Sequence, residues 1–233
     1  MPVDLVAHGA GYLFASHRFV GLARARLRAI SATGAPTDLD ENTGAGQHTY
    51  ATFAASLGGK PVWGGYVSPA TGRLKGFLRV AGGADVPLSG EEVPVSTAVR
   101  DDALLALFVA APVTPPSYVV LRRFTLAGSQ LVEDVAFSSG GRTRLDLSAG
   151  AASDPGGFEP RGVVADGLRT AFVVPQAANV HALVEVGTPL RTVLSLPSLV
   201  PPKVARRCEG ILVATTEVGG KVRIRAFDAT NKE

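Results

Sequence analysis

Short apolar runs, separated by breaks that contain Gly or Pro, are the feature that most limits what this 233-residue chain can fold into. A nearly continuous apolar run of four to eight residues is typical of a strand covered on both faces. Such runs occupy 12–15, 50–55, 104–111, 170–174 and 211–214. Alternating apolar and polar residues, typical of strands with one face near solvent, occupy 119–126, 180–186 and 222–227. The pattern predicts an all-β fold.

The breaks between these runs have the composition of hairpin turns, as at 58–61, 70–72, 127–129 and 219–220. The five nearly continuous runs start at irregular intervals that average about 50 residues, close to the length of a propeller blade repeat. We therefore expect one all-β domain over 1–233, built as an irregular β-propeller-like array of about five hairpin or blade units. A β-sandwich or jelly-roll with long loops is the alternative.

The segment 19–30 fits either a helix or a strand. As a helix it would line one face with apolar residues. As a strand it would place Arg24, Arg26 and Arg28 on one side and small apolar residues on the other. We favour the strand because it is consistent with the other units, and the three arginines would then form a solvated or partner-facing ladder.

The last third of the chain carries a repeat-like pattern. The segment 160–167 reads P-R-G-V-V-A-D-G and is followed by the apolar run 170–174 and its partner 179–183, and a further apolar run occupies 210–214. This pattern, over roughly 158–228, resembles the blades of the YVTN/NHL group of β-propellers. The resemblance implies a propeller-type array. The earlier units match that group in strand pattern alone.

Charge is scarce in this chain. Charged residues make up 18% of it, against about 25% in an average domain, while hydrophobic residues reach 46% and the mean hydropathy is +0.22. Because large exposed apolar patches are normally interaction sites, we expect part of the surface to pack against other protein subunits, with a homo-oligomer as one such arrangement. The net charge of +3 is spread along the chain, so no nucleic-acid partner is expected.

No membrane span is expected, because the longest apolar stretch, 103–113, is about half the length needed to cross a bilayer. The N-terminus lacks the pattern of a signal peptide, and we expect a soluble chain whose compartment the sequence leaves unknown. Cys208 is the only cysteine, so it predicts neither an intrachain disulfide nor a CxxC metal motif.

No catalytic residue is assigned, because neither a G-x-S-x-G elbow nor an S-x-x-K pair occurs. Calcium is the one cofactor that a sequence pattern suggests. Asp38, Asp40 and Asn42 place oxygen ligands at alternate positions, as the start of a calcium loop does. Thr43 and Thr49 stand where an EF-hand has its turn glycine and bidentate glutamate, so an exposed acidic turn is the favoured interpretation.

Trp63, the only tryptophan, is followed three residues later by Tyr66. Two aromatic rings so close in sequence could form a platform for a sugar or a partner protein. The alternative is that they are core or edge aromatics. With Arg24, Arg26 and Arg28, these two residues are the candidate binding residues.

Together these features predict a non-enzymatic structural or interaction protein that is a subunit of a larger assembly, such as a virion, a tail or another multi-protein particle. The first alternative is a propeller or lectin-like module that binds a peptide or a carbohydrate. The second is a lactonase-like hydrolase on a propeller scaffold, with Asp101, Asp102, Asp166 and His181 as nominal active-site residues.

Overall fold

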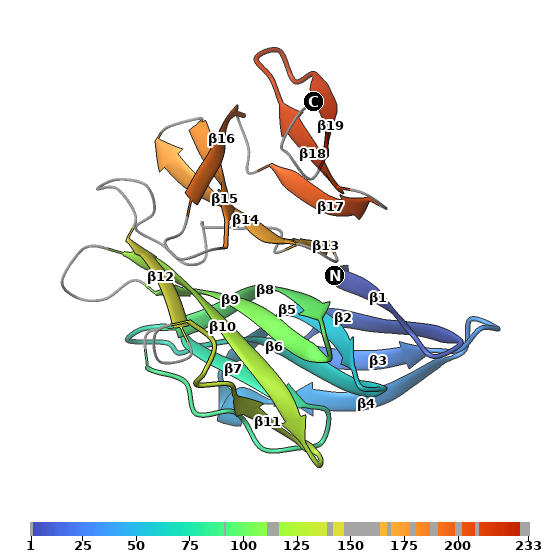
Figure 1. The fold of residues 1–233 in the computed structure, drawn as a ribbon. Coiled ribbons are helices and arrows are strands. Elements are labelled where there is room, and N and C mark those ends of the chain that lie inside the picture. The colour runs from blue at the N-terminus through green and yellow to red at the C-terminus, as the bar shows by residue number, and fades with distance from the viewer. Residues whose placement is uncertain are drawn as a thin grey trace.

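The part of the chain that the structure describes forms five antiparallel sheets in chain order (Figure 1). A computed structural model describes residues 2–90, 92–110, 117–138, 142–146, 164–166, 169–177, 180–186, 191–198, 202–207 and 210–228. We number the sheets 1 to 5 from the N-terminus. In each sheet, strands adjacent in sequence are mostly neighbours in space, as hairpin connections require.

Sheet 1 consists of β1 (Pro2–His8), β2 (Gly11–Val20), β3 (Leu22–Ile30) and β4 (Pro36–Asn42). The short 3-10 helix η1 (Gly44–Gly46) leads to sheet 2, which consists of β5 (His48–Leu57), β6 (Lys60–Ser68) and β7 (Lys75–Val80). Sheet 3 consists of β8 (Glu92–Arg100), β9 (Ala103–Ala110), β10 (Tyr118–Ala127), β11 (Gln130–Glu133) and β12 (Arg142–Asp146), and both β11 and β12 pair with β10.

Sheet 4 consists of β13 (Val164–Asp166), β14 (Arg169–Ala177), β15 (Val180–Glu185) and β16 (Arg191–Pro197). Sheet 5 consists of β17 (Lys203–Arg207), β18 (Gly210–Thr216) and β19 (Val222–Asp228).

The predicted all-β fold and the predicted array of about five units are confirmed. The five nearly continuous apolar runs fall in β2, β5, β9, β14 and β18, one in each sheet. The ambiguous segment 19–30 is extended, with β2 ending at Val20, a turn at Gly21 and β3 beginning at Leu22. Gly21 has a φ of +71°, a conformation that favours glycine and lets the chain reverse here. The repeat-like start at 160–163, residue 167 and Cys208 lie outside the described residues.

Consecutive sheets pack face to face through four apolar clusters. The first cluster joins sheets 1 and 2 around Leu27 and Trp63, and the second joins sheets 2 and 3 around Phe53 and Phe108. The third joins sheets 3 and 4 around Phe172, and the fourth joins sheets 4 and 5 through residues that include Leu183, Ile211 and Phe227. Sheets 2, 3 and 4 are therefore covered on both faces. Sheets 1 and 5 each have one face in a cluster.

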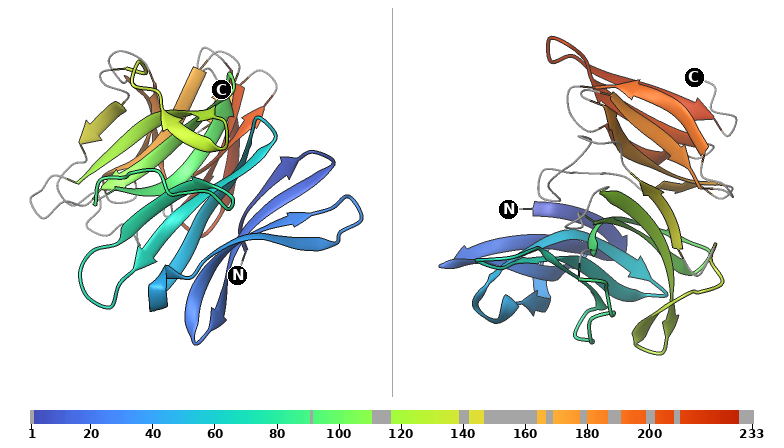
Figure 2. Two further views of the ribbon diagram at one scale, coloured as in Figure 1. Left: turned by 90° about the horizontal axis from the view of Figure 1, so that it is seen from below. Right: turned by 90° about the vertical axis from the view of Figure 1, so that its left-hand side faces the viewer.

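The first strands of successive sheets are neighbours: β1 contacts β5, β5 contacts β8, β8 contacts β13, and β13 contacts β17. Sheets 1 to 3 lie together in the lower half of the molecule and sheets 4 and 5 in the upper half (Figures 1 and 2). In a β-propeller, the first strands of successive blades lie next to one another around a central axis. The sheets of this chain follow that arrangement, and each has three to five strands.

A buried ion network lies in the cluster between sheets 2 and 3. The Arg122 guanidinium lies over the rings of Phe108 and Phe124, at 5.2 and 5.1 Å from their centroids. It donates to Glu92 at 2.8 Å and, through two nitrogens, to Glu133 at 2.7 and 2.6 Å. Desolvation acts to raise the pKa of the Glu133 carboxyl, but the hydrogen bonds and charges of Arg122 and Arg142 outweigh it and hold that pKa below its ordinary value.

Candidate interaction surfaces

Sheet 1 carries a row of charged side chains on the face turned away from sheet 2. On β3, alternation turns Ala25 and Leu27 toward sheet 2 and the arginines between and beside them to the other side. The cross-strand register adds one arginine of β2 and two carboxylates of β4 to this side. We call this set the arginine face: Arg18, Arg24, Arg26, Arg28, Asp38 and Glu41.

The two carboxylates of the arginine face bridge its four arginines. Glu41 accepts a hydrogen bond from Arg18 at 2.9 Å and lies 3.5 Å from Arg24. Asp38 accepts from Arg26 and, at 2.8 Å, from Arg28. Desolvation acts to raise the pKa of the Asp38 carboxyl, but the hydrogen bonds and charges of these two arginines outweigh it and hold the pKa below its ordinary value.

The structure separates Asp38 from Asp40 and Asn42, the other two residues predicted as calcium ligands. The register of β4 against β3 shifts by one residue, so Arg28 faces Asp38 while Leu27 faces Asp40. This bulge turns the two aspartates to opposite sides of the sheet, where unbroken alternation would place them on the same side. Asn42 lies on the same side as Asp40, and its side-chain oxygen accepts a hydrogen bond from the Gly44 N–H. Among the described residues no group of three or more His, Cys, Asp or Glu side chains could hold a metal ion, so the calcium interpretation finds no geometric support.

Asp40 is a structural acceptor in the cluster between sheets 1 and 2. Its carboxylate accepts hydrogen bonds from Trp63 Nε1 at 3.0 Å, from two nitrogens of Arg79 at 3.0 and 3.2 Å, and from the Gly82 N–H at 3.0 Å. The Arg79 guanidinium lies 5.2 Å from the centroid of the Trp63 ring, and Phe77 contacts the same ring edge-on.

Trp63 is fully buried, with 0% of its surface exposed, so it cannot form an exposed stacking platform. Tyr66 lies elsewhere, because residues three apart on a strand point to opposite faces. Its ring stacks on Tyr50 with the centroids 5.1 Å apart. Tyr50 in turn contacts His17 and His48, and His17 contacts the exposed ring of Phe19. The structure thus separates the predicted aromatic pair and places Tyr66 in a partly exposed aromatic cluster that the sequence did not indicate.

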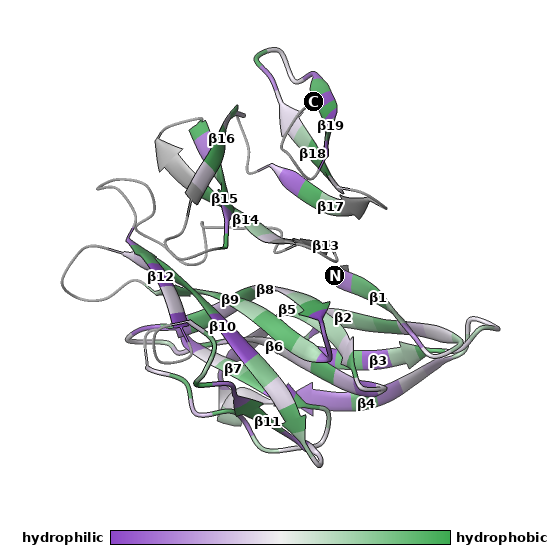
Figure 3. Ribbon diagram, in the orientation of Figure 1, coloured by the Kyte–Doolittle hydropathy of each residue, from purple (hydrophilic) through white to green (hydrophobic). Residues whose placement is uncertain are grey.

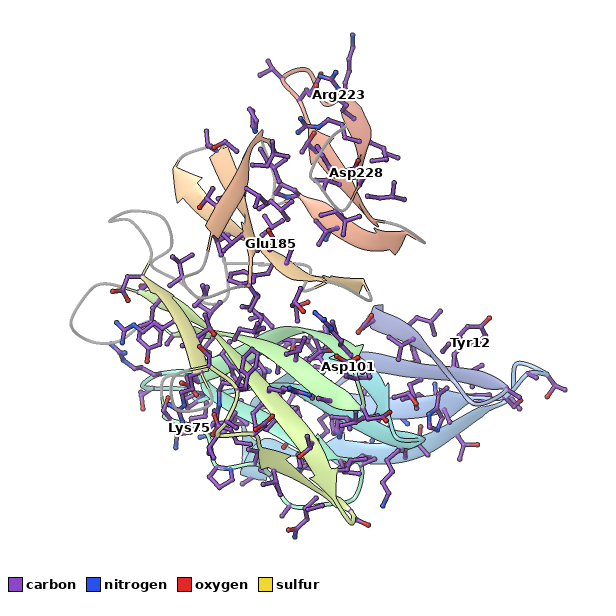
Figure 4. The ribbon with its side chains drawn as sticks, in the orientation of Figure 1. Tyr12, Lys75, Asp101, Glu185, Arg223 and Asp228 are labelled. Atoms are coloured by element: carbon purple, nitrogen blue, oxygen red, sulfur yellow. The ribbon has the colours of Figure 1, made fainter. Side chains whose placement is uncertain are left out.

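Sheet 5 exposes apolar side chains on the face turned away from sheet 4. Ile211, Val213 and Phe227 pack against sheet 4, and the register places the residues between them on the opposite side. We call that side the apolar end face; its residues on β18 and β19 are Leu212, Ala214, Thr216, Val222, Ile224 and Ala226, and the register adds Ala205 of β17 and, at the margin, the charged Lys203 and Asp228. Val222 and Ile224 expose 66% and 69% of their surface. Figure 3 shows the hydropathy of each strand, and the side chains of sheet 5 appear in Figure 4 around the labelled Arg223 and Asp228.

The nominal active-site residues of the hydrolase alternative lie on separate elements. Asp101 and Asp102 form the turn between β8 and β9, both with positive φ. Asp166 ends β13, and His181 is buried on β15, where desolvation lowers its pKa. In the part of the chain that the structure describes, no helix is long and apolar enough to span a membrane.

Comparison with known proteins gives matches among solved structures. No family model matches the chain, and no curated protein matches it. Among solved structures, the crystal structure of a puromycin hydrolase matches with a TM-score of 0.42 and 18% identity, over 99% of this chain and 38% of that chain. A serine-to-alanine mutant of puromycin hydrolase, complexed with PGG, matches with a TM-score of 0.44 and the same identity and coverage. The chain therefore spans less than half the length of these two structures.

Proposed function

We propose that this chain is a non-catalytic interaction protein that assembles with a second copy of itself through the apolar end face. The observation that supports the proposal is the exposure of Val222 and Ile224 on a sheet whose other face is packed. Each of the four sheet-to-sheet junctions among the described residues buries apolar side chains between two sheets. The apolar end face offers the same kind of surface to a further sheet.

The same face of a second subunit is the partner that this surface fits. Removing apolar surface from water contributes about 25 cal/mol per Å² to an association, and this gain must outweigh the loss of translational and rotational freedom. The outer face of sheet 1 is a poorer partner, because four arginines and two carboxylates would lose water on contact with apolar side chains. A twofold pairing of the apolar end faces buries Ile224 of each subunit and meets two charged side chains of the described residues, Lys203 on the outer strand β17 and Asp228 at the end of β19.

Light scattering coupled to size-exclusion chromatography, over a concentration series, tests the proposal. The wild type is expected to rise above the 24.0 kDa mass of one chain as the concentration increases. Ile224→Lys is expected to remain monomeric, because a second copy would have to bury its ammonium group. Val218→Lys is the matched control, since Val218 is an equally apolar, 87% exposed residue in the turn beside the face.

A wild type that stays monomeric at every concentration would overturn the proposal. So would Val218→Lys and Ile224→Lys variants that dissociate to the same extent, since the apolar end face would then have no special part in the association.

The aromatic cluster around Tyr66 supports a second candidate function, a module that binds a carbohydrate or peptide. Partly exposed rings of Tyr50 and Tyr66, with Phe19 at the margin, provide apolar faces on which a sugar can stack. Ligand-observed NMR with a panel of oligosaccharides tests this candidate. Binding lost in Tyr66→Ala and kept in Ile224→Lys would support it, and no binding by the wild type would remove it.

A further inference from the structure

The arginine face of sheet 1 has more positive than negative charge. Its four guanidinium groups come from β2 and β3, and the ion pairs among the described residues join them to two carboxylates. Arg18 and Arg24 stand directly opposite each other on neighbouring strands, an arrangement that like charges disfavour. The face therefore keeps about two positive charges that its own carboxylates do not balance.

The surplus charge is open to a ligand. The side chains of Arg18, Arg24 and Arg28 expose 46%, 33% and 31% of their surface. Guanidinium groups bind carboxylates through paired hydrogen bonds, so an anionic partner would supply the acceptors that this face lacks.

The spacing of the arginines favours one form of anionic partner. Arg24, Arg26 and Arg28 follow one another at every second residue of β3, and on a strand this spacing is about 6.6–7 Å. An extended peptide repeats its side chains on one side at the same interval. Val20 and Tyr12, both on this side of the sheet and exposed, offer apolar contact beyond each end of the row. Figure 4 shows Tyr12 on the surface of sheet 1.

We infer that the arginine face binds an extended acidic peptide segment that carries carboxylates at every second residue. The surface is separate from the apolar end face of sheet 5, so this inference does not depend on the proposed self-assembly.

Fluorescence anisotropy with a labelled peptide of alternating Glu and Thr tests the inference. The wild type is expected to bind it at about 50 mM salt and to lose affinity as the salt concentration rises, because the contacts are ionic. Arg24→Gln combined with Arg28→Gln, the two more exposed arginines of β3, is expected to weaken binding by roughly tenfold or more, at up to about fivefold for each exposed ion pair. Arg144→Gln is the matched control, since Arg144 is also exposed and paired with an aspartate, but lies on sheet 3.

Glu41→Gln provides the opposite change on the same face. Glu41 lies within ion-pair distance of Arg18, Arg24 and Arg26, so its neutralisation leaves three guanidinium groups for the peptide. The expected result is binding tighter by about three- to fivefold. A loss of affinity in this variant would contradict the inference.

The last measurements compare two peptides and one polymer by the same anisotropy assay. They use the Ile224→Lys variant as the background, so that self-association does not contribute. A peptide of the same composition with its Glu residues in one block is expected to bind more weakly than the alternating peptide. Equal binding of the two peptides, tighter binding of a sulfated polysaccharide, or no binding of the alternating peptide at low salt would each overturn the inference.

Discussion

Strands β9 of sheet 3 and β19 of sheet 5 use apolar residues in opposite ways. All eight residues of β9 are buried, because sheets 2 and 4 cover the two faces of sheet 3. On β19, Phe227 is buried, whereas the apolar Val222 and Ile224 are exposed. Sheet 3 even buries a charged side chain, Arg122, with 1% of it exposed. What decides whether a side chain is covered is the presence of a neighbouring sheet, and apolar character alone does not decide it.

The strongest test of this contrast is Arg122→Ala. The change removes the 2.8 Å partner of Glu92, which is 2% exposed and keeps a longer contact of 3.7 Å with the half-exposed Arg142, and we expect a loss of about 3–5 kcal/mol in the free energy of unfolding. Urea unfolding followed by circular dichroism measures it. Arg123→Ala is the matched control, because Arg123 is the next residue, one-third exposed and 3.6 Å from Asp134, and its loss should cost less than about 1 kcal/mol. Equal losses in the two variants would show that sheet 3 is not covered as described.

A second test separates the two faces of sheet 5. Ile211→Ala removes a buried side chain from the cluster with sheet 4 and is expected to cost about 2–4 kcal/mol. Ile224→Ala changes the same residue type on the neighbouring strand, but on the exposed side, and is expected to change the stability of the monomer by less than about 0.5 kcal/mol. Urea unfolding at low protein concentration compares them. A large loss for Ile224→Ala would mean that the apolar end face is already covered within one chain.

The sequence predicts local features of this fold, and it does not predict the contacts that distant strands make. The strand pattern predicted the five sheets, because period-two alternation and turn chemistry are local properties. It also placed Arg24, Arg26 and Arg28 on one side of a strand, where they lie. Arg122 and Arg123 look alike in sequence, and the difference between them arises from the Phe rings and carboxylates that other strands bring to Arg122.

The candidate site residues show the same limit. A single-residue bulge at β4 separates Asp38 from Asp40, and no residue type in that segment predicts a bulge. The short spacing between Trp63 and Tyr66 in the sequence suggests an exposed aromatic platform. The Trp63 ring lies in the core instead, where its N–H donates to the Asp40 carboxylate. On β19, the sequence shows that apolar and charged residues alternate, but it does not show which of the two sides packs against sheet 4.

The contrast between covered and open sheets also predicts a pH dependence at His181. Burial in sheet 4 lowers the pKa of this imidazole, so the folded chain binds a proton less readily than the unfolded chain. The stability from the neutral side chain is present above the ordinary pKa of 6.5 and is lost as the pH falls below it. We expect the melting temperature to fall between about pH 8 and about pH 5, and to fall less in His181→Leu. The same fall in both proteins would assign the dependence to other groups, such as His17.

The smallest expected effect distinguishes the two open faces from each other. Glu41→Gln on sheet 1 removes a carboxylate that three arginines share, and Glu217→Gln beside sheet 5 removes one that, among the described residues, pairs with Arg223 at 3.4 Å. Both sites are partly exposed, so each loss of stability is expected to stay below about 1 kcal/mol. The loss for Glu41→Gln should be the larger and should shrink as salt is raised from about 50 to about 500 mM, because the four arginines that remain repel one another. Thermal melts at the two salt concentrations measure it. If the two variants lose the same stability with the same salt dependence, the arginine face is merely a solvated surface, and the charge surplus that distinguishes sheet 1 from sheet 5 has no energetic weight.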